Sequence, residues 1–161
     1  KCRGKKKYIR ECIHDDNKYT VFLVEDNQEL LSWMLEHLKK EYNVYYETNG
    51  NKALKKLHMI PLPDIILSDI MMPVMDGQQF YKCVQHIADF RSIPFIFFTA
   101  KKSLEEKLKS YKSGVIDYIE KPFSIDVISE KINSIIRHDI LYTNDKIKKK
   151  QKMYIYLWKN N

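Results

Sequence analysis

The chain has 161 residues, a formal net charge of +7 and 44% hydrophobic residues. This length suits one domain with some flanking sequence, the apolar content is enough for a hydrophobic core, and 30% charged residues indicate a soluble protein. No stretch approaches the roughly 20 apolar residues of a membrane span and no secretory signal opens the chain, which excludes membrane contact by this segment.

Strand-like and helix-like patterns alternate from Tyr19 to about Arg137. Short continuous apolar runs predict buried strands, and apolar residues three and four positions apart predict the helices between them. The predicted strands are Thr20–Glu25, Val44–Glu47, Ile65–Asp69, Ile93–Phe98 and Ile116–Ile119.

A helix is predicted after each strand, and turn or capping residues mark several helix ends. Asn49-Gly50 leads into the second helix. Ser103 and Glu106 form a predicted capping box at the start of the fourth helix, and Gly114 ends it. The third helix is predicted from Gln78 to Ala88, and the last helix opens at Ser124. The predicted apolar faces are Leu30, Leu31, Met34, Leu35 and Leu38 in the first helix, and Ala53, Leu54 and Leu57 in the second. In the third helix they are Phe80, Val84 and Ile87, and in the last helix Val127, Ile128, Ile132, Ile135 and Ile136.

Five strand–helix units in series predict an α/β fold, a doubly wound parallel sheet with helices on both faces and right-handed crossovers. The nearly continuous apolar strands agree with this fold, because parallel strands are buried on both faces. Ligands of such folds bind beyond the carboxyl ends of the strands. We therefore expect a functional site at that edge of the sheet.

Polar side chains follow four of the five predicted strands. A buried strand that ends in a carboxylate, as Ile65–Asp69 does, needs a partner or a function for that charge. If the strands lie parallel, three carboxylates, a hydroxyl and an ammonium gather at one edge, which predicts a site for magnesium and a phosphoryl group. The residues are Glu25, Asp26, Asp69, Thr99 and Lys121.

Together with Met71-Met72-Pro73-x-x-Asp76-Gly77, these residues resemble the motif set of response-regulator receiver domains of bacterial two-component systems. The resemblance covers about Tyr19 to Arg137. It implies a flavodoxin-like (βα)5 fold with strand order 2-1-3-4-5, and a phosphorelay role in which a histidine kinase donates a phosphoryl group to an aspartate. Ser68–Gly77 and Tyr118–Ser124 are most similar to receivers of hybrid histidine kinases.

The resemblance implies a role for each residue of the site. Asp69 is the expected phosphoacceptor, and Thr99 and Lys121 would bind phosphoryl oxygens. Thr99 and Tyr118 would form a switch that repacks the face made by the fourth predicted helix, the fifth strand and the last helix. The expected cofactor is Mg²⁺, with Mn²⁺ as an alternative, and its expected ligands are Asp26, Asp69, the backbone carbonyl of Met71 and, directly or through water, Glu25.

Four further motif residues are expected to have structural roles. Asp76-Gly77 reads as a turn and helix entry. The resemblance implies a cis peptide bond between Lys121 and Pro122, which proline permits. The four residues are Pro73, Asp76, Gly77 and Pro122.

Two positions depart from the commonest receiver pattern. Glu25 stands where many receivers have aspartate, and its greater length favours contact with the metal through water. Met71, two residues beyond Asp69, offers no polar group that could position an attacking water. We therefore expect a relatively long-lived phosphoaspartate.

Each residue also has a purely structural explanation. Glu25 and Asp26 suit the start of a helix, Thr99 suits a strand end, and Lys121 suits the surface. Tyr118 suits a half-buried position in a strand. Their joint occurrence at one edge favours the phosphoacceptor over these separate coincidences.

Three other functions compete with the phosphoacceptor. A magnesium-dependent aspartyl-phosphate phosphatase of the haloacid-dehalogenase type would need a second aspartate where Met71 stands. A pseudo-receiver that only binds partners would be favoured if Asp26, Asp69 or Lys121 were missing, and all three are present. DNA binding by the basic ends lacks a recognisable motif.

We expect a linker or N-terminal extension at residues 1–18, the receiver domain at 19–138, and a basic and aromatic C-terminal linker or tail at 139–161. The tail is basic at Lys146–Lys152 and apolar at Met153–Trp158, so an extended helix, a partner-binding segment or the start of a further element also fits. The first residue is lysine, which suggests a fragment of a longer protein.

The expected partner is a histidine kinase domain, in the same polypeptide or in another. A homodimer across the switch face is a second expectation, and DNA would be contacted only through a domain outside this chain. The parent protein is expected to be a hybrid sensor kinase and response regulator that controls transcription; the receiver itself would add at most self-dephosphorylation. The cysteines lack metal-ligand spacing, which predicts reduced thiols in the cytoplasm. They are Cys2, Cys12 and Cys83.

Overall fold

The computed structural model describes residues 13–100 and 116–159. Within these ranges five parallel strands form one sheet in the order β2-β1-β3-β4-β5, which confirms the predicted order. The strands are β1 (Thr20–Val24), β2 (Asn43–Glu47), β3 (Ile65–Asp69), β4 (Phe95–Thr99) and β5 (Ile116–Glu120), and the helices are α1 (Gln28–Leu38), α2 (Gly50–Leu57), α3 (Gly77–His86) and α5 (Ile125–Lys159).

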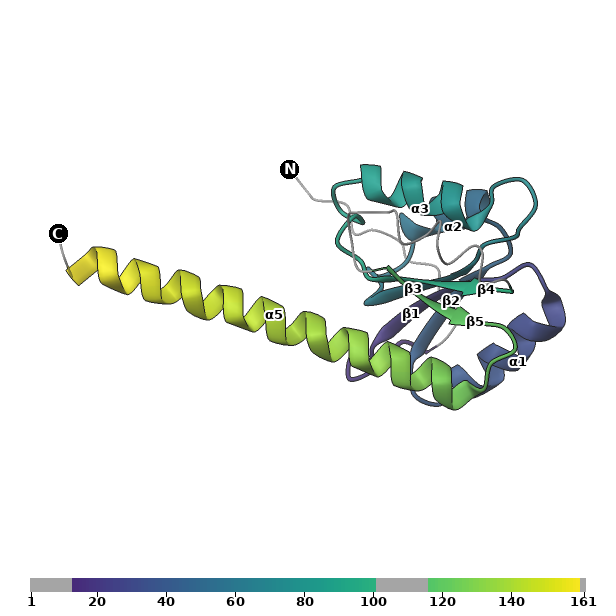
Figure 1. Ribbon diagram of the computed structural model, residues 1–161, viewed down its shortest axis with the longest axis horizontal. Coiled ribbons are helices and arrows are strands. Elements are labelled where there is room, and N and C mark those ends of the chain that lie inside the picture. The colour runs from purple at the N-terminus through teal and green to yellow at the C-terminus, as the bar shows by residue number, and fades with distance from the viewer. Residues whose placement is uncertain (1–12, 101–115, 160–161) are drawn as a thin grey trace.

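Helices cover both faces of the sheet. Figure 1 shows α2 and α3 on one face, and α1 and α5 on the other. Successive residues of a strand point to opposite faces, so Phe22 and Phe97 pack in the cluster under α2 and α3, while Leu23 and Phe98 pack in the cluster under α1 and α5. Because β1, β3 and β4 are buried along their whole length, they appear in the sequence as continuous apolar runs.

Capping side chains precede α1, α2 and α3. Asn27, Asn49 and Asp76 precede α1, α2 and α3, and each side chain accepts a hydrogen bond from a backbone N–H in the first turn. Gln79 completes a capping box with Asp76. The caps of α1 and α3 thus lie just beyond the strand ends that carry the acidic residues.

Most observed element ends lie within two residues of the predicted ones, and the last helix is the exception. The alternating pattern was expected to end near Arg137, with a linker favoured beyond it; α5 continues to Lys159, and no glycine or proline interrupts that segment. The extended helix, which was one of the alternatives for the C-terminal segment, is the form that the structure shows (Figure 1). In the described part of the chain, no helix combines the length and the apolar composition needed to cross a membrane. The predicted helix between Ser103 and Gly114 lies outside the described residues.

Residues ahead of β1 are tied to the sheet by Asn43. Its buried side chain donates hydrogen bonds from Nδ2 to the carbonyl oxygens of Asp15 (2.8 Å) and Lys18 (3.0 Å), and its Oδ1 accepts one from the N–H of Asp15 (2.9 Å). The end of the segment expected to be an N-terminal extension therefore packs against the start of β2.

Candidate functional site

The pairing of β1 with β3 brings the predicted acidic residues together. Val24 pairs with Ser68, so the next residues, Glu25 and Asp69, lie side by side at the carboxyl edge of the sheet. One carboxylate oxygen from each of Glu25, Asp26 and Asp69 lies within 4.8 Å of the other two. Glu25 and Asp69 are buried, whereas Asp26 is not.

Lys121 comes from the end of β5 and lies between two of these carboxylates. Its Nζ is 3.1 Å from Oε2 of Glu25 and 3.3 Å from Oδ1 of Asp69. Its backbone N–H donates a hydrogen bond of 2.7 Å to the carbonyl oxygen of Thr99, which anchors the start of the β5–α5 connection to β4. The pair of Lys121 with Glu25 was not anticipated from the sequence.

Backbone N–H groups hold two of the carboxylates. The N–H of Asn27 donates to Oε1 of Glu25 at 3.0 Å, and the N–H of Ile70 donates to Oδ1 of Asp69 at 2.9 Å. Sequence reasoning missed both donors. The only signal for the first was an asparagine directly after the acidic pair, at a position that suits a helix cap.

The electrostatics of the pocket disfavour ionisation of the buried carboxylates. Burial is the main cause that raises the pKa of Glu25, and the charge of Asp69 raises it further; the N–H of Asn27 and the ammonium of Lys121 oppose this. Burial likewise raises the pKa of Asp69 above its usual value, while Lys121 opposes the rise. Burial removes water from these carboxylates and makes their negative charge unfavourable. A pocket of this kind is suited to bind a cation, because the cation offsets that charge.

The two predicted switch residues lie on β4 and β5. Thr99 ends β4 and is buried, one position beyond Phe98, which pairs with Asp69 in the neighbouring strand. Tyr118 pairs with Phe97 and is half-buried against the cluster under α2 and α3. The rest of the predicted switch face includes residues 101–115, which lie outside the described part of the chain.

The loop between β3 and α3 carries the remaining motif residues. Met71 is 72% exposed and follows the buried Ile70. Asp76 caps α3, and a Cβ at Gly77 would collide with the backbone of Asp69, so glycine permits this close approach. The peptide bond between Lys121 and Pro122, in the facing connection, is cis, as the resemblance implies.

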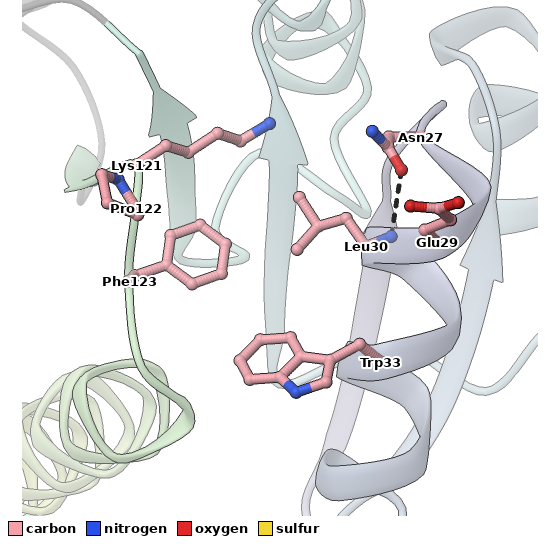
Figure 2. Close-up of a pocket in the computed structure, with 7 residues that line it drawn as sticks. All are labelled: Asn27, Glu29, Leu30, Trp33, Lys121, Pro122 and Phe123. Carbon is pink, nitrogen blue, oxygen red and sulfur yellow. Dashed lines mark hydrogen bonds between the residues drawn. The ribbon is translucent and has the colours of Figure 1, made fainter.

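A pocket of about 590 Å³ opens beside the acidic cluster, between α1 and the β5–α5 connection. Figure 2 shows Trp33 and Leu30 of α1 facing Phe123, with the side chain of Lys121 reaching away from this apolar wall. The ring centroids of Trp33 and Phe123 are 6.4 Å apart. Phe123 packs partly against the cluster under α1 and α5 and also lines this opening. The full lining is Asn27, Glu29, Leu30, Trp33, Lys121, Pro122 and Phe123.

Comparisons with known proteins agree with this architecture. Histidine kinase P4 of Formosa agariphila is 32% identical over 130 residues, which are 81% of this chain and 9% of that relative. Hybrid signal transduction histidine kinase D of Dictyostelium discoideum is 34% identical over 127 residues, 79% of this chain and 8% of that relative. The chain thus spans about a tenth of the length of these relatives.

A similar solved structure is the receiver domain of a sensor histidine kinase from Pseudomonas aeruginosa, described with a magnesium ion coordinated in its active-site cleft. It has a TM-score of 0.63 and 27% sequence identity, over 74% of this chain and 98% of that chain. The model of the response regulator receiver domain family matches residues 21–133. The flavodoxin-like sheet, the acidic pocket and this match together show that the chain belongs to the response regulator receiver domain family.

Proposed function

We propose that this chain is the phosphoacceptor domain of a two-component phosphorelay, in which a kinase phosphohistidine donates its phosphoryl group to Asp69 in a magnesium-dependent reaction. The observation that carries the proposal is the position of Lys121, whose Nζ lies 3.1 Å from Glu25 and 3.3 Å from Asp69, beside the three clustered carboxylates. A nucleophile, a metal-binding cluster and a cation for the phosphoryl oxygens are thereby brought to one place.

The donor set suits a magnesium ion. Mg²⁺ binds oxygens at about 2.0–2.1 Å, so two of its ligands lie at most about 4.2 Å apart, and the carboxylates spread over up to 4.8 Å. Both oxygens of Glu25 already have partners, the N–H of Asn27 and the ammonium of Lys121. We therefore assign Asp26 and Asp69 as direct ligands, together with the backbone carbonyl of Met71, and place a water between Glu25 and the metal. Mn²⁺ would fit the same oxygen ligands.

Each residue of the site has a separate role in phosphoryl transfer. A carboxylate oxygen of Asp69 attacks phosphorus, an O–P bond forms, and the N–P bond of the phosphohistidine breaks with its electron pair going to the imidazole nitrogen. Lys121 moves its ion pair from Asp69 to a phosphoryl oxygen, and the hydroxyl of Thr99 donates a hydrogen bond to another. Bound Mg²⁺ would supply positive charge against the phosphoryl oxygens.

The phosphoryl group would be read out through Thr99 and Tyr118. A turn of Thr99 toward the phosphoryl group would leave space that Tyr118 can enter, which repacks the face formed by β5, α5 and the preceding segment. This face is the candidate surface for a homodimer or for the next domain. The proposed parent protein is a cytoplasmic hybrid kinase that controls transcription. Similarity to histidine kinases, of which this chain matches only a small part, supports the kinase part of this proposal.

The test is to incubate the protein with Mg²⁺ and acetyl phosphate and to measure its intact mass. We expect one added phosphoryl group, its loss when Mg²⁺ is chelated, and none in Asp69→Asn. The matched control is Asp64→Asn, which changes an exposed carboxylate before β3 and should still be phosphorylated.

Two outcomes would contradict the proposal. Steady hydrolysis of acetyl phosphate without a retained adduct would indicate a phosphatase. An unmodified wild-type protein under conditions in which Mg²⁺ binds would indicate a receiver fold that only binds partners.

A further inference from the structure

The loop between β3 and α3 (residues 70–76) is held from the side by the first residue of α2. The N–H of Gly50 donates a hydrogen bond of 3.1 Å to the carbonyl oxygen of Met75. A Cβ at Gly50 would lie 2.8 Å from Cγ of Met75, and 2.9 Å from both the Met75 carbonyl oxygen and Cβ of Phe80. Side chains do not pack at such distances, so only glycine lets α2 approach the loop this closely.

From Met75 a short path of backbone hydrogen bonds leads to the phosphoacceptor. Two residues after Met75, the N–H of Gly77 donates to the carbonyl oxygen of Ile70 at 2.9 Å. The N–H of Ile70 in turn donates to Oδ1 of Asp69 at 2.9 Å. We therefore expect a movement of Met75 to be passed through Gly77 to Ile70, whose N–H is bonded to the Asp69 carboxylate.

The loop contains a turn that needs external support. Val74 has φ of 70°, and the N–H of Met75 donates to the carbonyl oxygen of Pro73 at 2.9 Å, which closes a three-residue turn. A β-branched residue is unfavourable in this conformation. The side chain of Val74 is 82% exposed, so its own packing does not offset that energy. The bond from Gly50 to Met75 supports the turn from outside, together with the packing of the partly buried Met75 side chain against the cluster under α2 and α3.

We propose that Gly50 is a positioning residue for the phosphoacceptor. By bracing Met75 it fixes the loop 70–76 and hence the orientation in which the Asp69 carboxylate meets the metal and the phosphoryl group. The inference rests on the proposed function and deepens it, because it assigns a role in that site to α2, which supplies none of its side chains. The simpler alternative is that Gly50 only permits α2 to pack against Phe80 of α3.

The test compares Gly50→Ala with Asn49→Ala in the intact chain. Asn49→Ala removes the cap in which Oδ1 accepts from the N–H of Lys52 at 3.0 Å, so it weakens the start of α2 without adding an atom near Met75. Both variants are first shown to unfold cooperatively. Calorimetric titration with Mg²⁺ should then give a dissociation constant raised by about three- to tenfold for Gly50→Ala and unchanged for Asn49→Ala. Adding Met75→Ala to Gly50→Ala should restore part of the affinity, because it removes the contact at Cγ.

Equal magnesium affinity in folded Gly50→Ala and wild type would overturn the proposal, as would an equal loss in Asn49→Ala. A wild-type measurement covers the case in which Gly50→Ala does not fold. Because coupling is reciprocal, bound Mg²⁺ should slow hydrogen exchange of the Gly50 and Gly77 amides, and an unchanged Gly50 amide would overturn the inference. If Mg²⁺ does not bind to the wild type, or if Asp26→Asn does not remove the binding, the proposed function itself is wrong. That result is obtained before any Gly50 variant is compared.

Discussion

The two halves of the pocket are held in different ways. In the acidic half, at the ends of β1 and β3, Glu25 and Asp69 accept hydrogen bonds from backbone N–H groups one or two residues further along the chain. In the cation half, at the ends of β4 and β5, Lys121 reaches Thr99 through its backbone and two carboxylates through its Nζ, all across strands. Strand pairing brings Glu25 and Asp69 together, but each carboxylate is then oriented by a local backbone N–H, whereas Lys121 is held by contacts across strands. Metal binding and phosphoryl binding should accordingly be separable by mutation.

The largest effect is expected from Asp26→Asn in the acidic half. The substitution removes a negative ligand from the cluster of three carboxylates, so the Mg²⁺ dissociation constant should rise by about 10- to 100-fold. Calorimetric titration measures this change directly. Glu29→Gln is the matched control, because Glu29 is exposed in the first turn of α1 and outside the cluster. Similar losses in both variants would mean that general electrostatic attraction, and not ligation, binds the metal.

A smaller effect is expected from Thr99→Ala in the cation half. Loss of a hydrogen bond to a charged phosphoryl oxygen should slow phosphorylation by acetyl phosphate about tenfold at saturating Mg²⁺. The Mg²⁺ dissociation constant should stay near the wild-type value, since Thr99 is not one of the clustered carboxylates. Intact mass against time gives the rate. If the substitution weakened metal binding as strongly as Asp26→Asn does, the two halves would not be separable.

Met71→Asn tests the rim of the acidic half. Wild-type phosphoaspartate should last for minutes or longer in Mg²⁺, because the exposed Met71 offers no group to position water. Asparagine supplies an amide there, and we expect the lifetime to fall about fivefold. Decay of the phosphorylated mass after removal of the donor measures it. A wild-type half-life of seconds would contradict the prediction, and Leu62→Asn, which changes an exposed apolar residue outside the loop, serves as the control.

The smallest effect is expected on stability, from Asp69→Asn without metal. Burial raises the pKa of Asp69 in the folded state, so its contribution to stability is full below the unfolded pKa and is lost as pH rises through the folded pKa. Asparagine removes that loss, so the variant should be more stable than wild type at neutral pH. The difference should shrink as pH falls below the usual aspartate range. Urea unfolding at several pH values checks both statements, and a less stable variant at neutral pH would refute them.

Several features of the fold could be predicted because their signal is local. Continuous apolar runs marked β1, β3 and β4, since strands buried on both faces need such runs. The basic and aromatic composition after Arg137 favoured a linker, with an extended helix as an alternative; α5 runs through this segment, which contains no glycine or proline. The amino-acid composition of a segment depends on what the segment contacts, and the sequence of one chain does not identify those contacts.

The amino-acid sequence was sufficient to predict which chemical groups meet, because parallel strands place their carboxyl ends at one edge of the sheet. The residues at these ends are Glu25, Asp26, Asp69, Thr99 and Lys121. How these side chains are held depends on contacts between distant parts of the chain. The ion pair joins Lys121 to Glu25, which are 96 positions apart in the sequence. The hydrogen bond from Gly50 to Met75 joins the start of α2 to the loop before α3, and no sequence pattern links these two segments. Such contacts depend on strand order and on helix packing to within fractions of an ångström, and no local pattern encodes distances of that kind.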